Sequence, residues 1–139
     1  MSAKVKRYYI DELGVKYEDT PQGWNPGDPR QKEWSKARKE IGFDERETWD
    51  LKYTVDLFLY ERLCDYKNIA QGCIDLEFHT FEYENKKITQ KECLDRMING
   101  LKLEITLGPF DERREDPEII KQIEDIYPIY NLCKESLWW

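Results

Sequence analysis

The feature that most constrains this chain is a long run without glycine or proline, from Asp44 to Gln71. From Trp49 onward, apolar residues occupy alternate positions, which is typical of a strand, but the same residues also satisfy helical spacing. Asp44 is followed three residues later by Glu47, the spacing of a capping box. The length of the run, its cap and its lack of helix breakers favour a helix over 45–69. Because apolar residues occur on several of its sides, we expect this helix to be the central element, packed all round.

Three further helices are predicted from start and stop signals. Asp28 and Asp116 each precede a proline, which suits the first position of a helix, and Thr89 begins a second capping box. Pro128 lies within the last helix and should kink it by removing one hydrogen bond. The expected ranges of these helices are 29–41, 90–107 and 117–137.

Two segments outside the helices have different patterns. Over residues 73–88 apolar and polar residues alternate around a polar turn, which predicts one or two short strands, or an extended excursion between helices. Residues 1–28 contain several glycines and prolines and are expected to form an N-terminal arm. A short strand is expected near Val5–Ile10, and Trp24 should pin the arm to a helical domain of residues 29–139.

The predicted fold class is therefore mainly α: a compact helical bundle around a central helix, with a minor β-hairpin or extended segment. The chain has 139 residues. A chain of that length buries roughly two-thirds of its unfolded surface, which is enough for one hydrophobic core.

Composition argues against several classes of function. The chain has 22 Lys and Arg against 29 Asp and Glu, a net charge of −7. This argues against direct nucleic-acid binding, because such binding depends on cations that neutralise phosphates. No run approaches the ~20 apolar residues of a membrane span, and the first residues lack the apolar run of a signal peptide. We therefore expect no membrane association and a cytoplasmic location.

No pattern of catalytic, metal-binding or cofactor-binding residues stands out. The single histidine, His79, is more consistent with a structural role, and no glycine-rich phosphate-binding loop occurs. The four cysteines form no close pair of the kind that binds zinc. Cys64, Cys93 and Cys133 occupy apolar helical positions and are expected to be small buried side chains. We predict no catalytic residue, no metal and no cofactor.

Carboxylate pairs offer an alternative. Helical Mg²⁺-dependent nucleotide hydrolases use carboxylates three or four residues apart, so that two of them face one metal ion. The pairs with this spacing are Glu47 with Asp50, Glu61 with Asp65, and Glu92 with Asp95. Acidic residues are expected in the first turn of a helix from its dipole alone, so this alternative ranks below a binding function.

The acidic surface is the most usable functional signal. Four acids and no Lys or Arg occur from Asp75 to Glu84, and seven acids against three cations occur from Asp111 to Asp125. A solvated face is the ordinary meaning of such runs. Flanking aromatics would also let this surface dock on a basic groove of another protein, with a large aromatic side chain as the anchor. The candidate interaction residues are Trp24, Asp75, Glu77, Glu82, Glu84 and Trp138.

Part of the sequence resembles small uncharacterised proteins of bacteriophages and prophages. The residues that carry the resemblance are Glu47-Thr48-Trp49-Asp50-Leu51 within residues 42–54, the Thr-capped apolar stripe over 89–98, and Leu137-Trp138. The resemblance implies a helical fold and a phage context, and hence the cytoplasm of a host cell. It brings no known activity, and no functional residue is carried over from it.

These observations favour a non-enzymatic accessory protein that binds and modulates, most simply by inhibition, a host or defence protein. Nucleic-acid-handling enzymes are one class of such partners. A competing hypothesis is a nucleotide-binding protein that uses aromatic faces together with Arg46 or Arg62. The Mg²⁺-dependent hydrolase is a second, and a structural component whose apolar C-terminal end seals a homodimer is a third.

Overall fold

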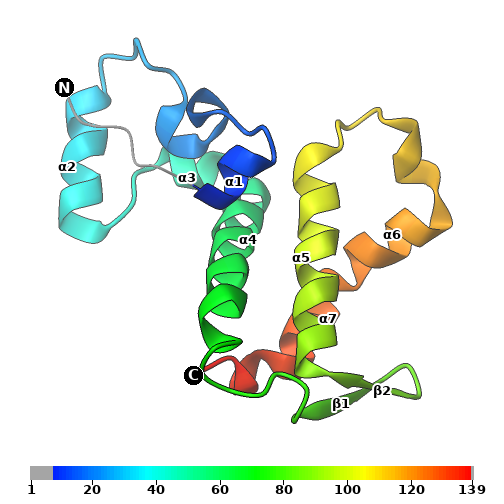
Figure 1. The fold of residues 1–139 in the computed structure, drawn as a ribbon. Coiled ribbons are helices and arrows are strands. Elements are labelled where there is room, and N and C mark those ends of the chain that lie inside the picture. Colours follow the sequence, from blue (N-terminus) through cyan, green and yellow to red (C-terminus); the bar gives the residue numbers. More distant parts are fainter. Residues whose placement is uncertain (1–7, 139) are drawn as a thin grey trace. The chain divides into compact units, whose positions relative to one another are not determined.

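The computed structural model describes residues 8–138 and is mainly α-helical with one small antiparallel hairpin, which confirms the predicted fold class (Figure 1). The chain divides into two compact units, residues 1–58 and 59–139. The division falls within the long helix α4, Leu51–Ala70. The boundary expected between an arm of residues 1–28 and a domain of residues 29–139 stays a prediction.

The first unit is built from short helices. Its elements are α1 (Tyr8–Glu12), two 3-10 turns (Tyr17–Asp19 and Pro21–Gly23), α2 (Gln31–Ile41), α3 (Arg46–Trp49) and the first turns of α4. The strand expected near Val5–Ile10 is wrong over residues 8–10, which are helical, and Val5 lies outside the described residues. Helix α1 is followed by a turn at Gly14, whose φ of 81° is favourable for glycine and whose N–H donates to the carbonyl of Asp11.

The end of α2 was predictable and its start was not. Gly42 adopts the left-handed conformation, φ 88°, and its N–H donates to the Arg38 carbonyl, which is the expected glycine C-cap. The helix begins at Gln31 rather than at residue 29. The backbone of Arg30, with φ −79° and ψ 4°, lies outside the helical region, so the helix starts one residue later.

The helix expected over 45–69 is real but is divided at Asp50, where the backbone leaves the helical region. The Asp50 carboxylate accepts the N–H of Tyr53 at 3.1 Å and so caps α4. The expectation that this helix is packed all round is wrong for its first two turns. Leu51, Val55 and Phe58 are exposed at 61%, 40% and 52%.

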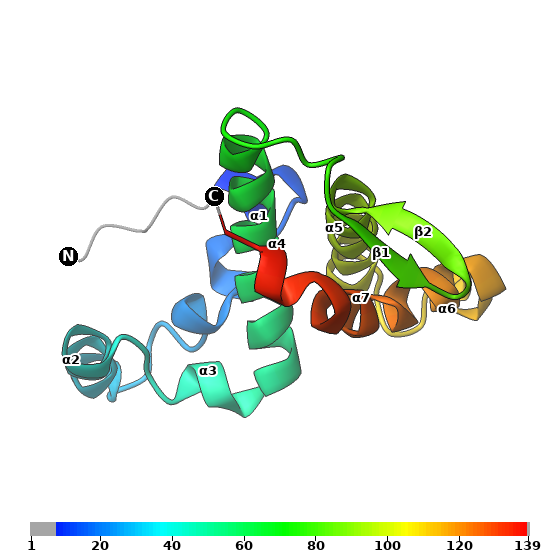
Figure 2. The ribbon, with the colours of Figure 1, turned by 90° about the horizontal axis from the view of Figure 1, so that it is seen from below.

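The second unit contains the hairpin and a three-helix core. After the remainder of α4 come β1 (Thr80–Tyr83), β2 (Lys86–Thr89), α5 (Gln90–Thr106), a 3-10 turn (Glu112–Glu115), α6 (Pro117–Glu124), α7 (Ile126–Cys133) and a final 3-10 turn (Lys134–Ser136). Glu84 and Asn85, with φ of 50° and 63°, form the two-residue turn that matches the twist of a hairpin. The hairpin confirms the prediction for this segment, and Figure 2 shows it beside α5.

Helix α5 organises the core of this unit. The Thr89 hydroxyl accepts the N–H of Glu92, which confirms the predicted N-cap. The side chains buried along α5 and α7 are Cys93, Leu94, Met97, Leu101, Ile126, Ile129 and Cys133. At Gly100, α5 and α6 approach so closely that an added methyl group would lie 2.5 Å from the Gln122 carbonyl oxygen.

The single helix expected over 117–137 is wrong, because the chain turns at Asp125 between α6 and α7. Pro128 has no N–H, and its ring clashes with a helical carbonyl four residues earlier. That carbonyl belongs to Glu124, the last residue of α6. The predicted disturbance therefore occurs before the proline and produces a break rather than a kink.

Candidate functional site

The six candidate interaction residues lie in different environments, and only Trp24 belongs to the first unit. The Trp24 ring stacks on Trp49 and Tyr53, with centroid distances of 6.4 and 6.2 Å. Its carbonyl accepts a hydrogen bond from the buried guanidinium of Arg46 at 2.9 Å. These contacts make Trp24 part of the packing of the first unit.

Two of the acids in the second unit face cations within the same unit. Glu82 lies opposite Lys87 in the hairpin register. Glu84 forms an ion pair with Lys121, whose ammonium group also donates to Asp125 at 2.9 Å. Their negative charge is thus partly compensated within the chain, which the sequence spacing of residues 75–84 does not reveal.

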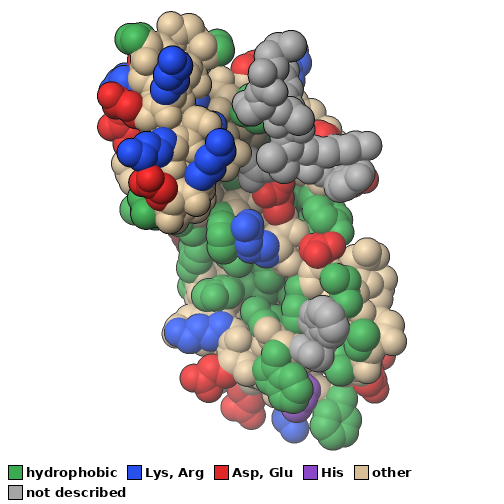
Figure 3. All heavy atoms as spheres, turned by 90° about the vertical axis from the view of Figure 1, so that its left-hand side faces the viewer, with side chains coloured by type: hydrophobic (Ala, Val, Ile, Leu, Met, Phe, Trp, Pro, Cys, Tyr) green, Lys and Arg blue, Asp and Glu red, His purple; other side chains and the backbone are tan. Residues whose placement is uncertain are grey.

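Asp75 and Trp138 lie together in one cavity of about 300 Å³, which we call the Phe78–Trp138 pocket. The lining residues are Ile74, Asp75, Phe78, His79, Ser136 and Trp138. Its two large aromatic side chains are strongly exposed, Phe78 at 77% and Trp138 at 71%. In Figure 3 the single histidine lies among hydrophobic side chains on this face, with acidic side chains nearby. Two residues far apart in sequence are therefore joined in one site.

The carboxylate of Asp75 is oriented by a tight turn. Its Oδ1 accepts the N–H of Glu77 at 2.9 Å, and its backbone carbonyl accepts the N–H of Phe78 at 3.1 Å. The other oxygen, Oδ2, has no hydrogen-bond or ion-pair partner among residues 8–138. Asp75 also lines a neighbouring depression, which it shares with Glu77, Lys67 and Lys91, but neither lysine forms an ion pair with it. Of the predicted acids, Asp75 is thus the one that combines a fixed orientation with an aromatic pocket.

Two polar side chains, the buried Gln90 and the half-buried Tyr66, hold the C-terminal wall of the pocket. The Tyr66 hydroxyl donates to the Trp138 carbonyl at 3.0 Å. The Gln90 amide donates to the Ser136 carbonyl at 3.0 Å and to the Tyr66 oxygen at 2.9 Å. Burial raises the pKa of Tyr66, so this phenol stays protonated and able to donate. Sequence reasoning missed both residues, because neither carries a local signal for contact with the C-terminal segment.

A second feature that was missed is local and readable in the sequence. Each of the three Asp-x-Arg sequences forms the same structure, which we call the Asp-x-Arg turn. In each, the backbone N–H of the arginine donates to Oδ1 of the aspartate at 2.9 Å, and the guanidinium donates to both carboxylate oxygens at 2.8–3.1 Å. The pairs are Asp28–Arg30, Asp44–Arg46 and Asp111–Arg113.

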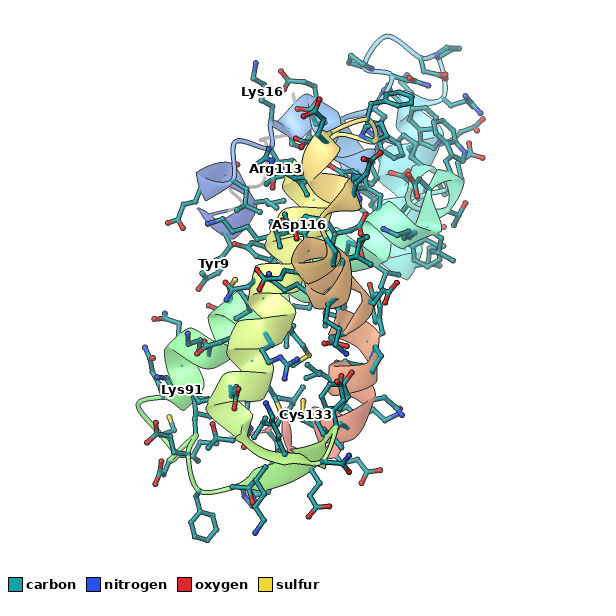
Figure 4. All side chains as sticks on the ribbon, turned by 90° about the vertical axis from the view of Figure 1, so that its right-hand side faces the viewer. Tyr9, Lys16, Lys91, Arg113, Asp116 and Cys133 are labelled. Atoms are coloured by element: carbon teal, nitrogen blue, oxygen red, sulfur yellow. The ribbon has the colours of Figure 1, made fainter. Side chains whose placement is uncertain are left out.

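The three turns differ in burial. Asp44 and Arg46 are buried, whereas Arg30 and Arg113 are largely exposed. The hydrogen bonds from arginine lower the pKa of Asp28 to about 2, and those in the third turn do the same for Asp111. Figure 4 labels Arg113, which lies in the segment between α5 and α6.

The alternative sites gain little from the structure. The Arg46 guanidinium binds Asp44 and the Trp24 carbonyl and lies against the Trp34 ring. These internal contacts occupy the side chain that the nucleotide-binding hypothesis requires. Of the carboxylate pairs, Asp50 caps α4 and Asp95 pairs with Lys67. Within residues 8–138 no group of three or more His, Cys, Asp or Glu side chains is arranged to hold a metal ion.

The cysteines and the single histidine belong to no metal-binding group among residues 8–138. Cys93 and Cys133 are buried, as expected, and Cys64 is half-buried. The thiol of Cys133, which Figure 4 labels, lies against that of Cys93, and the hydrogen bond between them, together with burial, raises the pKa of Cys93. His79 is exposed, with its ring edge-on to Phe78 at 5.3 Å.

The charge of the chain is concentrated in the second unit. Residues 59–139 contain 17 Asp and Glu against 11 Lys and Arg, so they carry six of the seven net negative charges. The Phe78–Trp138 pocket belongs to this unit. No helix in the described part of the chain is long and apolar enough to cross a membrane.

Comparisons with protein-family models, with curated proteins and with solved structures gave no match. The resemblance to small phage proteins stays a prediction.

Proposed function

We propose that this chain is a non-enzymatic binding protein whose Phe78–Trp138 pocket receives a basic segment of a partner protein. The observation that carries the proposal is the pocket itself, in which two exposed aromatic side chains adjoin the oriented carboxylate of Asp75. In the phage context that the resemblance implies, the partner would be a host or defence protein, modulated by occupation of its basic surface.

The aromatic walls supply the contact area. Large exposed aromatic side chains are common anchors of protein interfaces, since they bury much surface with little loss of side-chain freedom. A cation over an aromatic face is stabilised by about 0.5–1 kcal/mol at exposed sites and by more when it is desolvated. Phe78 and Trp138 both line the pocket and are strongly exposed, so their rings are accessible to a guest side chain.

The charge of the second unit supplies the attraction over longer distances. A net charge of −6 on residues 59–139 draws a basic segment toward this unit, and such attraction raises association rates in a salt-dependent way. Acid–base complementarity also disfavours acidic segments, because like charges repel.

The test is binding of short basic peptides to the full chain. Two heptapeptides, Gly-Arg-Gly-Lys-Gly-Arg-Gly and its counterpart with three glutamates, would be titrated by NMR at low and at physiological ionic strength. We expect saturable chemical-shift changes with the basic peptide and none with the acidic one. Binding should be weaker at physiological ionic strength, where the Debye length is about 8–10 Å and charges further apart are screened. Trp138→Ala and Phe78→Ala should each weaken binding at least about fivefold, the lower range for an interface anchor.

The matched control is Phe110→Ala, which removes another aromatic side chain of the second unit that is 97% exposed but does not line the pocket. It should leave the affinity unchanged. Equal binding of the acidic peptide, or an equal loss in the Phe110 variant, would contradict the proposal.

A further inference from the structure

The Asp-x-Arg turns show what the carboxylate of Asp75 is built to accept. At Asp28, Asp44 and Asp111 the aspartate Oδ1 accepts the backbone N–H two residues ahead at 2.9 Å. In that geometry both carboxylate oxygens also accept N–H groups of a guanidinium fork. The Asp75 turn has the same backbone hydrogen bond at the same distance, from the N–H of Glu77.

The difference lies in the residue two positions ahead. In the three Asp-x-Arg turns that residue supplies the guanidinium from within the chain, but Glu77 carries a carboxylate and cannot do so. The turn at Asp75 therefore presents the same carboxylate without an internal arginine. From this we infer that the Phe78–Trp138 pocket selects an arginine side chain of the partner, which completes the fork with Asp75. The inference rests on the proposed function.

The walls of the pocket favour arginine over lysine. A guanidinium is planar and weakly hydrated, so its face stacks on an aromatic ring at little desolvation cost while its edge donates to a carboxylate. A lysine ammonium is compact and strongly hydrated. In a pocket lined by Phe78, Trp138 and one carboxylate, it would lose that hydration in exchange for a single charged acceptor. The first unit shows the same combination, since the Arg46 guanidinium binds Asp44 and lies 4.3 Å from the centroid of the Trp34 ring.

A fifth turn provides an internal control. The carboxylate of Asp116 accepts the N–H of Glu118 at 2.9 Å, again with a glutamate two positions ahead. This turn caps α6 and is not part of the aromatic pocket. If the carboxylate alone determined binding, Asp116 and Asp75 would behave alike.

The first experiment compares three small ligands on the unmodified full chain: the N-acetyl amides of arginine, lysine and citrulline. Citrulline has the shape of arginine without its charge. We expect arginine to bind at least about fivefold more tightly than lysine, since only the guanidinium both stacks and forks. Citrulline should bind least. Equal affinities for arginine and lysine would overturn the inference.

The second experiment uses Glu77→Arg, which converts the segment into a fourth Asp-x-Arg turn. The internal guanidinium should compete for Asp75 and reduce the affinity for the arginine ligand at least about tenfold, since it acts at high effective concentration. Glu118→Arg is the matched control at the Asp116 turn and should leave the affinity within a factor of two.

Asp75→Asn keeps an oxygen for the turn but removes the charge, so arginine should then bind no more tightly than citrulline. An arginine affinity that survives both Glu77→Arg and Asp75→Asn would overturn the inference. These outcomes are separable from failure of the proposed function. If no basic peptide binds at all, the proposed function is refuted, whereas equal binding of arginine and lysine to a functional pocket refutes the selectivity alone.

Discussion

Three turns of equal geometry and unequal burial allow the energetic effect of burial to be measured within one chain. We predict that Asp44→Asn destabilises the first unit far more than Asp28→Asn destabilises it, or Asp111→Asn the second unit. The asparagine keeps an acceptor for the backbone N–H in each turn, so the change removes the charge and not the turn. What differs is the arginine that remains: Arg46 is 1% exposed, Arg30 44% and Arg113 65%.

The magnitude follows from the fate of the uncompensated cation. Removing one partner of a buried ion pair typically costs about 3–5 kcal/mol, because the other charge stays buried. Asp44 also accepts a hydrogen bond from Arg38 at 2.6 Å, so two cations lose their partner at once. At the exposed turns water replaces the carboxylate, and we expect losses close to the experimental error.

Urea denaturation followed by tryptophan fluorescence is a suitable assay, because Trp24, Trp34 and Trp49 lie in the first unit and the Trp34 ring contacts the Arg46 guanidinium. The double variant Asp44→Asn with Arg46→Met should recover part of the loss, since it removes the buried cation as well. The reasoning is refuted if Asp44→Asn lowers the unfolding midpoint no more than Asp28→Asn does, or if the double variant is less stable than the single one.

Three further predictions concern the second unit. Gly100→Ala should destabilise the second unit by about 1–3 kcal/mol through overpacking, although alanine is the better helix former. The neighbouring Asn99 is exposed, so Asn99→Ala should stabilise the unit slightly. Burial opposes ionisation of Asp125, but hydrogen bonds from Tyr83 and Lys121 outweigh it and lower its pKa. The stability it contributes is therefore present above the unfolded pKa of about 4 and lost as the pH falls further, so Asp125→Asn should flatten the acid limb of a melting-temperature profile. Tyr66→Phe removes the hydrogen bond to the Trp138 carbonyl and should loosen the C-terminal wall. In a background without other tryptophans, the fluorescence anisotropy of Trp138 should then decay faster, and peptide binding should weaken. The control Tyr130→Phe should change neither the anisotropy decay nor the binding.

The elements of the fold that could be predicted are those with local signals. Thr89 caps α5 and Gly42 ends α2, as expected, because each acts through hydrogen bonds to residues three or four positions away. The hairpin followed from the alternation of apolar and polar residues. The break at Asp50 was missed, although an aspartate within an apolar run is more favourable at a helix cap than in a helix interior. For the last helix Pro128 predicted a disturbance, but the sequence did not show that it would be a break at Asp125.

The exposed start of α4 has a different cause. Periodicity shows which residues share a face, but it does not show whether another element covers that face. Leu51, Val55 and Phe58 repeat at helical spacing as core residues do, yet they face solvent. Burial of a long helix is a property of tertiary packing, and the pattern of apolar residues alone overestimated it.

The candidate site was predictable residue by residue but not as an arrangement in space. Sequence reasoning named Asp75 and Trp138 separately, but their meeting in one pocket depends on Tyr66 and Gln90 holding the C-terminal segment. The four acids from Asp75 to Glu84 look equivalent in sequence.

Glu82 and Glu84 nevertheless face lysines, and Asp75 is fixed by its own turn. Charge density therefore says less about recognition than the geometry of each carboxylate does. In the three Asp-x-Arg turns a carboxylate of this geometry binds an arginine guanidinium, and these turns differ in burial. Since the guanidinium fork forms in exposed and in buried turns alike, it does not depend on a particular environment around the carboxylate. What a partner must add at Asp75 is the arginine that Glu77 does not supply.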